Sequence, residues 1–422
     1  MDPVITGISA WQYWTTPPVI GEVDLPEGIA FAPHPNGVGL RPELRCDRDN
    51  ARELDALVAG RLLIDLKAVD TPVHVMADAA LSRTPTALSW PHKQVDWLES
   101  ADLVPLGGGL KVLSPHATLL SLARGMNVVS LALFIMEAAG LFAIWNETPA
   151  ASFVLNALLA QGVVDEAVQR ARRNHLREYY DARGTRVAPL GRGGGGIPWE
   201  LSFDRNGLPT DLWKRAPLTE VDEVRAYALS KSGARGSRKL LEAVDLAING
   251  SGSPLESRAL LLMCADCWKG GEGWKVPWVN RRVDYTPAAK RLTNTSYAIC
   301  DQLWLESGID VEINGFGYHA DRQGFLVKSG RTAALENMGL TVFDITYSQM
   351  ADLEQWDSRV QALSRVLGMG IRARTSAFLE RRECFHEQLF ERGRKKRRYF
   401  IAFGCCGKKQ ADTLSVFRGR LE

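Results

Sequence analysis

Residues 297–314 read YAICDQLWLESGIDVEIN, and this stretch decides the expected fold of the C-terminal part of the chain. It holds two predicted strands, 297–305 and 309–314, which are close enough in sequence to form a hairpin. Each strand carries one carboxylate between apolar neighbours, Asp301 in the first and Glu312 in the second. Burying an unpaired charge is costly, so two such carboxylates on consecutive strands indicate a shared partner. Mg²⁺ is the simplest partner, because it takes one or two carboxylates together with water and phosphate oxygens.

The sequence around this hairpin predicts one mixed α/β domain of about 115 residues, a normal size for a single core. The last strand of this domain comes after a helix, so a helical crossover must connect it to the sheet. The predicted elements are a helix from Ser253-Pro254, strands over 277–285, 297–305 and 309–314, a helix over 321–338, a strand over 340–346 and a helix over 351–367.

Upstream of this domain the sequence predicts a smaller α/β region and then helices. Short strands are expected over 71–77 and 110–113, and Ser114-Pro115 begins a helix with serine as the N-cap. Residues 125–145 form an apolar run that is long enough to span a membrane. Glu137 within this run favours a buried helix, over 127–145, because a charge near the centre of a membrane span is costly.

These predictions divide the chain into five parts. The expected parts are an irregular region over 1–68, an α/β region over 69–150, a helical connector over 151–250, the C-terminal α/β domain over 251–370 and a basic tail over 371–422. Helices are expected over 151–183 and 219–248, and the glycine-rich stretches 191–196 and 249–254 are expected to be flexible linkers.

The composition is that of an average folded chain. Of 422 residues, 45% are apolar and 24% are charged, which excludes a wholly disordered, collagen-like or coiled-coil protein. Seven irregularly spaced cysteines are too few for a disulfide scaffold, so a cytoplasmic location is expected. The N-terminal sequence MDPVITGISAWQYW has neither the basic nor the apolar segment of a signal peptide.

Charge is distributed unevenly along the chain. Residues 371–422 hold 14 Lys/Arg and 6 Asp/Glu, a net charge of +8, whereas the first 370 residues carry a net charge of −6. A basic tail on an acidic body is typical of an arm that binds a polyanion, most often nucleic acid, and a solvated terminus is the alternative. The nucleic-acid-binding residues expected in this tail are Arg392, Arg394, Lys395, Lys396, Arg397 and Arg398.

Five pieces of the region 254–370 stand in an informative order and spacing: SPLESRALLL, GGEGWKVPWVNRRV, CDQLW, VEINGFGYHAD and RTAALENMGLTVFDIT. Together they resemble the very-short-patch-repair-type branch of the PD-(D/E)xK nuclease superfamily, and more closely an uncharacterised bacterial domain family assigned to that branch. The resemblance implies a restriction-endonuclease-like mixed sheet flanked by helices. It also implies a Mg²⁺-dependent DNA endonuclease of defence or repair.

A second resemblance covers residues 70–145. Its pieces are TPVHVMADAALSRTP and VLSPHATLLSLARGM. They resemble the central region of type IV abortive-infection antitoxin-like proteins, which often carry a nuclease-like domain at the C-terminal end. This likeness implies a role in abortive infection, within a toxin-antitoxin pair.

The nuclease resemblance assigns roles residue by residue. Asp301 matches the first metal-binding aspartate, and Glu312 matches the acid of the E-x-K or E-x-D pair. Glu256 matches a helix glutamate that assists the metal site, and His319 matches a histidine after the pair. Either of these two side chains would orient or deprotonate the attacking water. Arg331 matches a basic residue that opens the next helix and is expected to contact nucleic acid.

Two positions depart from the family pattern. The third residue of the E-x-K or E-x-D pair is Asn314, and Lys328 stands where the family has an aspartate three residues before Arg331. Both changes remove an acid from the expected site and favour a protein that binds nucleic acid without cleaving it. Lys328 has two interpretations, a catalytic lysine that has moved to the helix or a solvated residue at the helix start.

Several of these residues also have a purely structural interpretation. Ser253 and Glu256 have the spacing of a capping box, in which glutamate serves the helix rather than a site. Asp301 is alternatively a polar residue of an edge strand that faces water. Four tryptophans of the domain are candidates for base stacking, although core packing is the favoured role for them. They are Trp268, Trp274, Trp278 and Trp304.

Two functions therefore follow from the sequence. The first is a metal-dependent DNA endonuclease, in which Asp301 and Glu312 hold Mg²⁺. The second is a non-cleaving, antitoxin-like regulator that binds nucleic acid through a degenerate nuclease fold.

Overall fold

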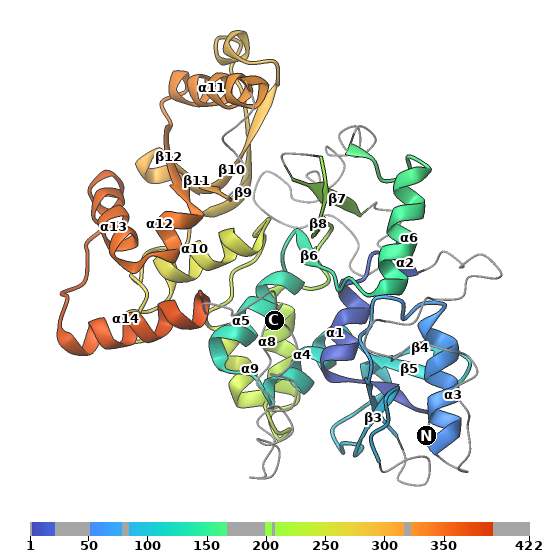
Figure 1. Cartoon of the computed structure of the whole chain (residues 1–422). Helices are drawn as coiled ribbons and strands as arrows, with labels where there is room; N and C mark the ends of the chain where they lie inside the picture. The colour runs from blue at the N-terminus through green and yellow to red at the C-terminus, as the bar shows by residue number, and fades with distance from the viewer. Residues whose placement is uncertain are drawn as a thin grey trace, which may run out of the picture.

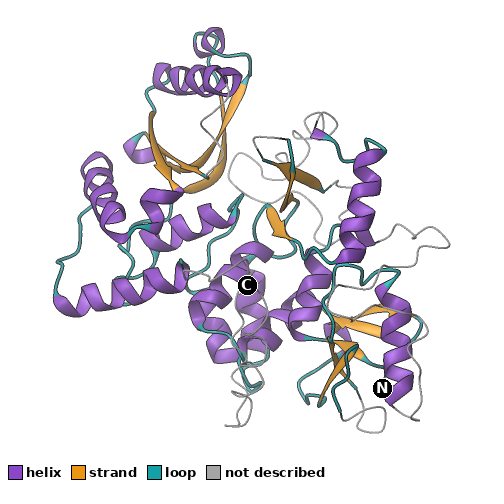
Figure 2. Ribbon diagram, viewed as in Figure 1, coloured by secondary structure: helices purple, strands orange, loops and turns teal. Residues whose placement is uncertain are grey.

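The computed structural model of the chain describes residues 2–21, 51–77, 84–166, 199–204, 207–315 and 322–390. These residues form three sheets, and helices pack around and between them (Figures 1 and 2), which confirms the predicted α/β class. Within this described part no helix is long and apolar enough to cross a membrane.

A five-stranded mixed sheet occupies the N-terminal part of the molecule. Its order is β3-β2-β1-β5-β4, with β1 antiparallel to β2 and parallel to β5. The predicted strands over 71–77 and 110–113 are confirmed as β2 and β5. The bounds are β1 (Val4–Ile5), β2 (Val73–Met76), β3 (Ser89–His92), β4 (Leu103–Gly107) and β5 (Leu110–Leu113), with a short 3₁₀ turn at Ser100–Asp102.

The prediction that residues 1–68 are irregular is wrong for the described part of this region. The two-residue strand β1 is the central strand of the sheet, and α1 (Gly7–Thr15) and α3 (Ala51–Leu62) supply apolar side chains to the core over it. A short helix, α2 (Pro18–Gly21), follows α1. Residues Val4 and Ile5 are fully buried, so the region is part of the fold.

Four helices form the centre of the molecule: α4 (Pro115–Ala123), α5 (Val128–Ala138), α8 (Val221–Ser230) and α9 (Ser237–Val244). The prediction that Ser114 caps a helix is confirmed, because its hydroxyl accepts a hydrogen bond from the N–H of Ala117 at 3.3 Å. The helix expected over 127–145 ends early, at Ala138, and the chain continues as strand β6 (Phe142–Ile144).

Gly140 explains why the apolar run changes direction. A Cβ atom there would lie 2.6 Å from the carbonyl oxygen of Met136 and 2.8 Å from that of Ser251, so only glycine fits. The stretch 249–254, predicted to be a flexible linker, is packed against this turn. The N–H of Gly250 donates to Ala139 and the carbonyl of Ser251 accepts from Leu141, at 3.0 and 2.8 Å. Ser251 is fully buried, so the linker prediction is wrong here.

The region 151–250 is not only helical. Strands β7 (Glu200–Phe203) and β8 (Pro209–Lys214) join β6 in a three-stranded antiparallel sheet of order β6-β8-β7. Helix α6 (Pro149–Ala160) packs its apolar face on this sheet. The glycine-rich stretch 191–196 lies outside the described residues.

The C-terminal sheet matches the sequence prediction closely. Its order is β12-β11-β10-β9, with antiparallel pairs β9–β10 and β10–β11 and a parallel pair β11–β12 joined by a helical crossover. The strands are β9 (Trp278–Asp284), β10 (Tyr297–Trp304), β11 (Ile309–Asn314) and β12 (Thr341–Thr346). The helices are α10 (Pro254–Cys264), α11 (Arg322–Asn337), α12 (Tyr347–Ala351), α13 (Leu353–Leu367) and α14 (Ser376–Leu389), with 3₁₀ turns at Ala289–Leu292 and Leu305–Ser307.

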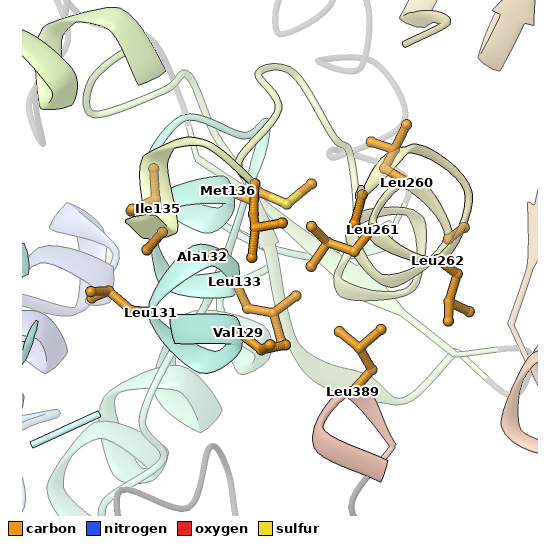
Figure 3. Close-up of a cluster of buried hydrophobic side chains, with 14 of the residues drawn as sticks. Val129, Leu131, Ala132, Leu133, Ile135, Met136, Leu260, Leu261, Leu262 and Leu389 are labelled. Carbon is orange, nitrogen blue, oxygen red and sulfur yellow. The ribbon is translucent and has the colours of Figure 1, made fainter. Parts of the chain in front are cut away.

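One apolar core continues from the central helices into the C-terminal region. Figure 3 shows side chains of α5 and α10 facing each other, with Leu389 of α14 below them. The same cluster includes Val311 of β11 and Trp356 of α13. The boundary expected near residue 250 therefore does not separate two cores.

Helix α14 shows that the basic tail begins later in the chain than predicted. The tail was predicted to begin at residue 371, but Phe378, Phe385 and Leu389 of this helix are buried. Residues 376–389 thus belong to the folded body. The six clustered basic residues over 392–398 lie outside the described part of the chain.

Candidate active site on the C-terminal sheet

The hairpin β10–β11 places the two predicted metal ligands, Asp301 and Glu312, on neighbouring antiparallel strands. Gln302 pairs with Val311 and Leu303 with Asp310, and one further residue in this register would bring Asp301 opposite Glu312. Directly opposed residues of an antiparallel pair have Cβ atoms about 4.5–5.5 Å apart. The observed pairing ends at Gln302, but the two carboxylates are close enough for the charge of Glu312 to raise the pKa of Asp301 after burial does so.

Asp301 takes the place of a backbone acceptor between the strands. Its Oδ2 accepts a hydrogen bond from the N–H of Ile313 at 2.9 Å. Burial raises the pKa of the Asp301 carboxyl well above its usual range, and the nearby carboxylates of Glu312 and Glu256 raise it further. Strand β10 is an inner strand of the sheet, so the alternative of a water-facing residue on an edge strand is wrong.

Glu312 forms an ion pair with Arg331 of α11. The same guanidinium lies 3.5 Å from Asp310 Oδ2 and donates to the carbonyl of Ile299 at 2.6 Å. Arg331, expected to contact nucleic acid, therefore directs its guanidinium at acids within the domain. Asp310 is two residues before Glu312 on the same strand, so the two carboxylates share one face of the sheet.

Asp310 was not among the predicted site residues, and it is fully buried. Burial, together with the neighbouring Glu312 carboxylate, raises the pKa of the Asp310 carboxyl to about 9. The alternation in IDVEIN was the signal for it, because it puts Asp310 and Glu312 on one face. The sequence interpretation considered only the acid of the family motif.

Asn314 and Lys328, the two positions that depart from the family pattern, meet in the structure. Lys328 Nζ lies 2.6 Å from Asp344 Oδ1 and 3.4 Å from Asn314 Oδ1. Asn314 Nδ2 donates to the same Asp344 oxygen at 2.7 Å. Asp344 on β12 is in register with Glu312 on β11. Lys328 is therefore neither at the helix start nor simply solvated, and α11 brings its ammonium group to position 314.

Glu256 combines the two interpretations given to it. The cap is present, because Ser253 Oγ accepts from the N–H of Glu256 at 3.2 Å. The Glu256 carboxylate, however, accepts from the N–H of Gly252 at 2.6 Å and from Asn280 Nδ2 at 2.7 Å. It is buried and close enough to Asp301 to raise the pKa of that carboxyl. The helix N-terminus thus holds a carboxylate at the edge of the acidic cluster.

The remaining candidates divide into buried, exposed and undescribed residues. Trp274 and Trp304 are buried and donate their indole N–H to backbone carbonyls, which confirms core packing for these two. Trp268 and Trp278 are exposed, so the favoured prediction of core packing is wrong for these two. His319 lies outside the described residues.

The donor set around β10 and β11 fits a hard cation with few protein ligands. In the part of the chain that the structure describes, no three His, Cys, Asp or Glu side chains are arranged to hold a metal ion. Two carboxylates, Asp301 and Glu312, nevertheless satisfy what Mg²⁺ ordinarily takes from a protein. Arg331 opposes metal binding, because it already neutralises Glu312.

Comparison with protein-family models, with characterised proteins and with solved structures gives no match for this chain. The function of the acidic cluster is therefore inferred from its geometry.

We expect Asp310→Asn to weaken the pH dependence of stability. The native pKa of about 9 lies far above the value of 3.8 for an unperturbed aspartate, so the native state holds an extra proton between these values. Stability from this group is complete below pH 4 and is lost as the pH rises toward 9. The slope of unfolding free energy against pH should differ between wild type and variant by up to about 1.4 kcal/mol per pH unit.

Urea denaturation at pH 6, 7 and 8 measures this difference. Asp284→Asn, on the exposed part of β9, is the matched control and should keep the wild-type slope. Parallel profiles for wild type and Asp310→Asn would show that Asp310 is ionised in the native state.

Proposed function

We propose that this protein is a metal-dependent nuclease whose site lies between β10, β11 and the N-terminus of α10. The observation that supports it best is the gathering of Asp301, Glu312 and Glu256 from three elements, with the pKa of Asp301 raised by burial and then by the other two carboxylates. Coupled carboxylates with perturbed pKa values are typical of functional sites. A divalent cation relieves their mutual repulsion.

In this proposal Asp301 and Glu312 hold Mg²⁺, which supplies Lewis acidity toward a phosphodiester when bound. Glu256, fixed by Gly252 and Asn280, orients the attacking water. Lys328 supplies to the phosphate the positive charge that the neutral side chain of Asn314 cannot supply. Its position beside Asn314 supports this role, because the resembling family carries a charged residue at that position of the strand.

The second candidate is a regulator that binds nucleic acid without cleaving it. The ion pair between Arg331 and Glu312 favours this function, because a neutralised carboxylate is a poorer metal ligand. In this case the acidic cluster is a structural remnant, and the basic segment 392–398 provides affinity for DNA.

Metal binding and cleavage together test the proposal. We expect Mn²⁺ to bind wild-type protein with measurable heat in calorimetry, and Asp301→Ala to lose most of that heat. Wild-type protein with Mn²⁺ or Mg²⁺ should also nick plasmid DNA. Asp284→Ala is the control for an exposed acid on the same sheet. Identical titrations for wild type and Asp301→Ala would refute the metal site, and metal binding without nicking would favour the regulator.

A further inference from the structure

An exposed tryptophan stands at the edge of the sheet that carries the acidic cluster. Trp278 begins β9, the outer strand next to β10, and 45% of its surface is accessible. The guanidinium of Arg281 lies over its ring, 4.1 Å from the centroid. A large aromatic ring held at the surface by a cation is unlike the buried Trp274 and Trp304 nearby, and it offers a stacking surface.

The register shows that this pair lies on the side of the sheet that carries Glu312. Trp278 pairs with Leu303, which in turn pairs with Asp310. Arg281 pairs with Cys300. Directly paired residues project from the same face of a sheet.

An irregularity in both strands makes this arrangement possible. In regular strands, residues three apart point to opposite faces, yet Cys300 and Leu303 pack in one cluster with α11. Opposite them, Asn280 has a φ of 48°, in the left-handed region that residues other than glycine rarely adopt. Asn280 thus separates Trp278 and Arg281 and lets both reach one face.

The stacking pair is close to the carboxylates. Asn280 and Asp301 occupy one row between the paired residues Arg281–Cys300 and Val279–Gln302, and the side chain of Asn280 donates to Glu256. Trp278 is two residues from this row, or about 7 Å along the strand at 3.3–3.4 Å per residue. The surrounding segment 275–291 is basic, because it holds the single acid Asp284 and five basic residues, Lys275, Arg281, Arg282, Lys290 and Arg291.

We propose that Trp278 and Arg281 form a stacking subsite for a base of single-stranded nucleic acid beside the carboxylate cluster. This inference rests on the proposed function and names its substrate class. An exposed ring stacks on any unpaired base, and a guanidinium next to it binds the adjoining phosphate. A duplex offers no such face, because its bases already stack on one another.

Binding of fluorescent 12-residue oligo(dT) and oligo(U) in EDTA tests the subsite without cleavage. We expect Trp278→Ala to weaken binding about tenfold, and Trp278→Phe to keep most of the affinity because it keeps a ring. The matched control is Trp268→Ala. Trp268 is 75% exposed and also lies against an arginine, Arg381 at 5.3 Å, but it is in the loop after α10 rather than on the sheet.

Trp268→Ala should bind within twofold of wild type. Equal affinities of wild type and Trp278→Ala, an equal loss in Trp268→Ala, or binding of duplex alone would each overturn the subsite. Cleavage that requires Asp301 but is indifferent to Trp278 removes the subsite and leaves the nuclease. Binding that requires Trp278, without any Asp301-dependent cleavage, removes the nuclease and leaves the subsite. A preference between the two oligomers tells which nucleic acid the subsite takes.

Discussion

Substituting Glu272 by glutamine is expected to lower the free energy of unfolding by about 3–5 kcal/mol, because it removes one of the two carboxylates that neutralise the buried guanidinium of Arg382. Glu272 is fully buried between two arginines of the C-terminal segment. Its Oε1 lies 2.5 Å from Arg382 and 3.1 Å from Arg374. Arg382 is itself buried, and Asp357 of α13 lies 2.5 Å from its second nitrogen. The network joins α13 and α14 to the loop after α10.

The loop that carries Glu272 is fixed by its backbone. A Cβ atom at Gly271 would lie 2.1 Å from the carbonyl oxygen of Ala265, so the chain can make this close approach only with glycine. The N–H of Glu272 donates to the carbonyl of Leu262 at 3.2 Å. Because the loop backbone is fixed, a small movement of the chain cannot expose this site to water. The loss of the Glu272 charge is therefore not compensated by hydration of the arginines.

Urea denaturation of wild type and Glu272→Gln at neutral pH measures the effect. Glu306→Gln is the matched control, because Glu306 forms an equally short pair with Lys275 at 2.5 Å while both side chains are more than half exposed. Exposed pairs contribute about 0–1 kcal/mol, so this variant should unfold close to wild type. Similar stabilities for Glu272→Gln and Glu306→Gln would mean that the network is hydrated rather than buried.

The buried network also shows which part of the fold the sequence could not reveal. Local patterns were sufficient for α10 and for the four strands of the C-terminal sheet, because each has its own periodicity and cap. Helix α14 reads as part of a basic tail, because Arg382 looks like a solvated charge until its partner, more than a hundred residues away, is known. Strand β1 was missed for a related reason. It has only two residues, which are too few to show the alternation of apolar and polar side chains that identifies a strand.

The candidate site was predictable to the extent that it follows from strand register. The hairpin that carries Asp301 and Glu312 was predicted correctly because consecutive strands with short connections form hairpins. Arg331 and Lys328 were harder to interpret, because their role depends on how α11 crosses the sheet, which no local pattern determines. The structure gives both cations acidic partners, Glu312 and Asp344 respectively. In the proposed nuclease, a bound metal must compete with the ion pair between Arg331 and Glu312.

Removal of Asp301 should have the largest effect on cleavage. Asp301→Asn keeps the size of the side chain but removes a charged ligand, so we expect the rate of metal-dependent DNA cleavage to fall at least about a thousandfold, the equivalent of roughly 4 kcal/mol in the transition state. Lys328→Met should reduce the rate about a hundredfold, as loss of one positive charge aimed at a developing negative charge does. Lys269→Met, in the exposed loop after α10, is the control and should leave the rate unchanged.

A relocated lysine separates a chemical role of Lys328 from a structural one. In the double variant Lys328→Met/Asn314→Lys, the ammonium group returns to the strand position next to Asp344, where Asn314 already lies 2.7 Å from the Asp344 carboxylate. If the charge at this place matters, the double variant should cleave at least about tenfold faster than Lys328→Met. Asn314→Lys alone should cleave no slower than wild type. Initial rates of oligonucleotide cleavage in Mn²⁺ measure all four proteins. A Lys328→Met variant as active as wild type would show that the ammonium group only holds α11 against Asp344. A wild-type protein that binds DNA without cleaving it would leave the regulator as the function of this fold, because the ion pair of Arg331 with Glu312 then outcompetes the metal.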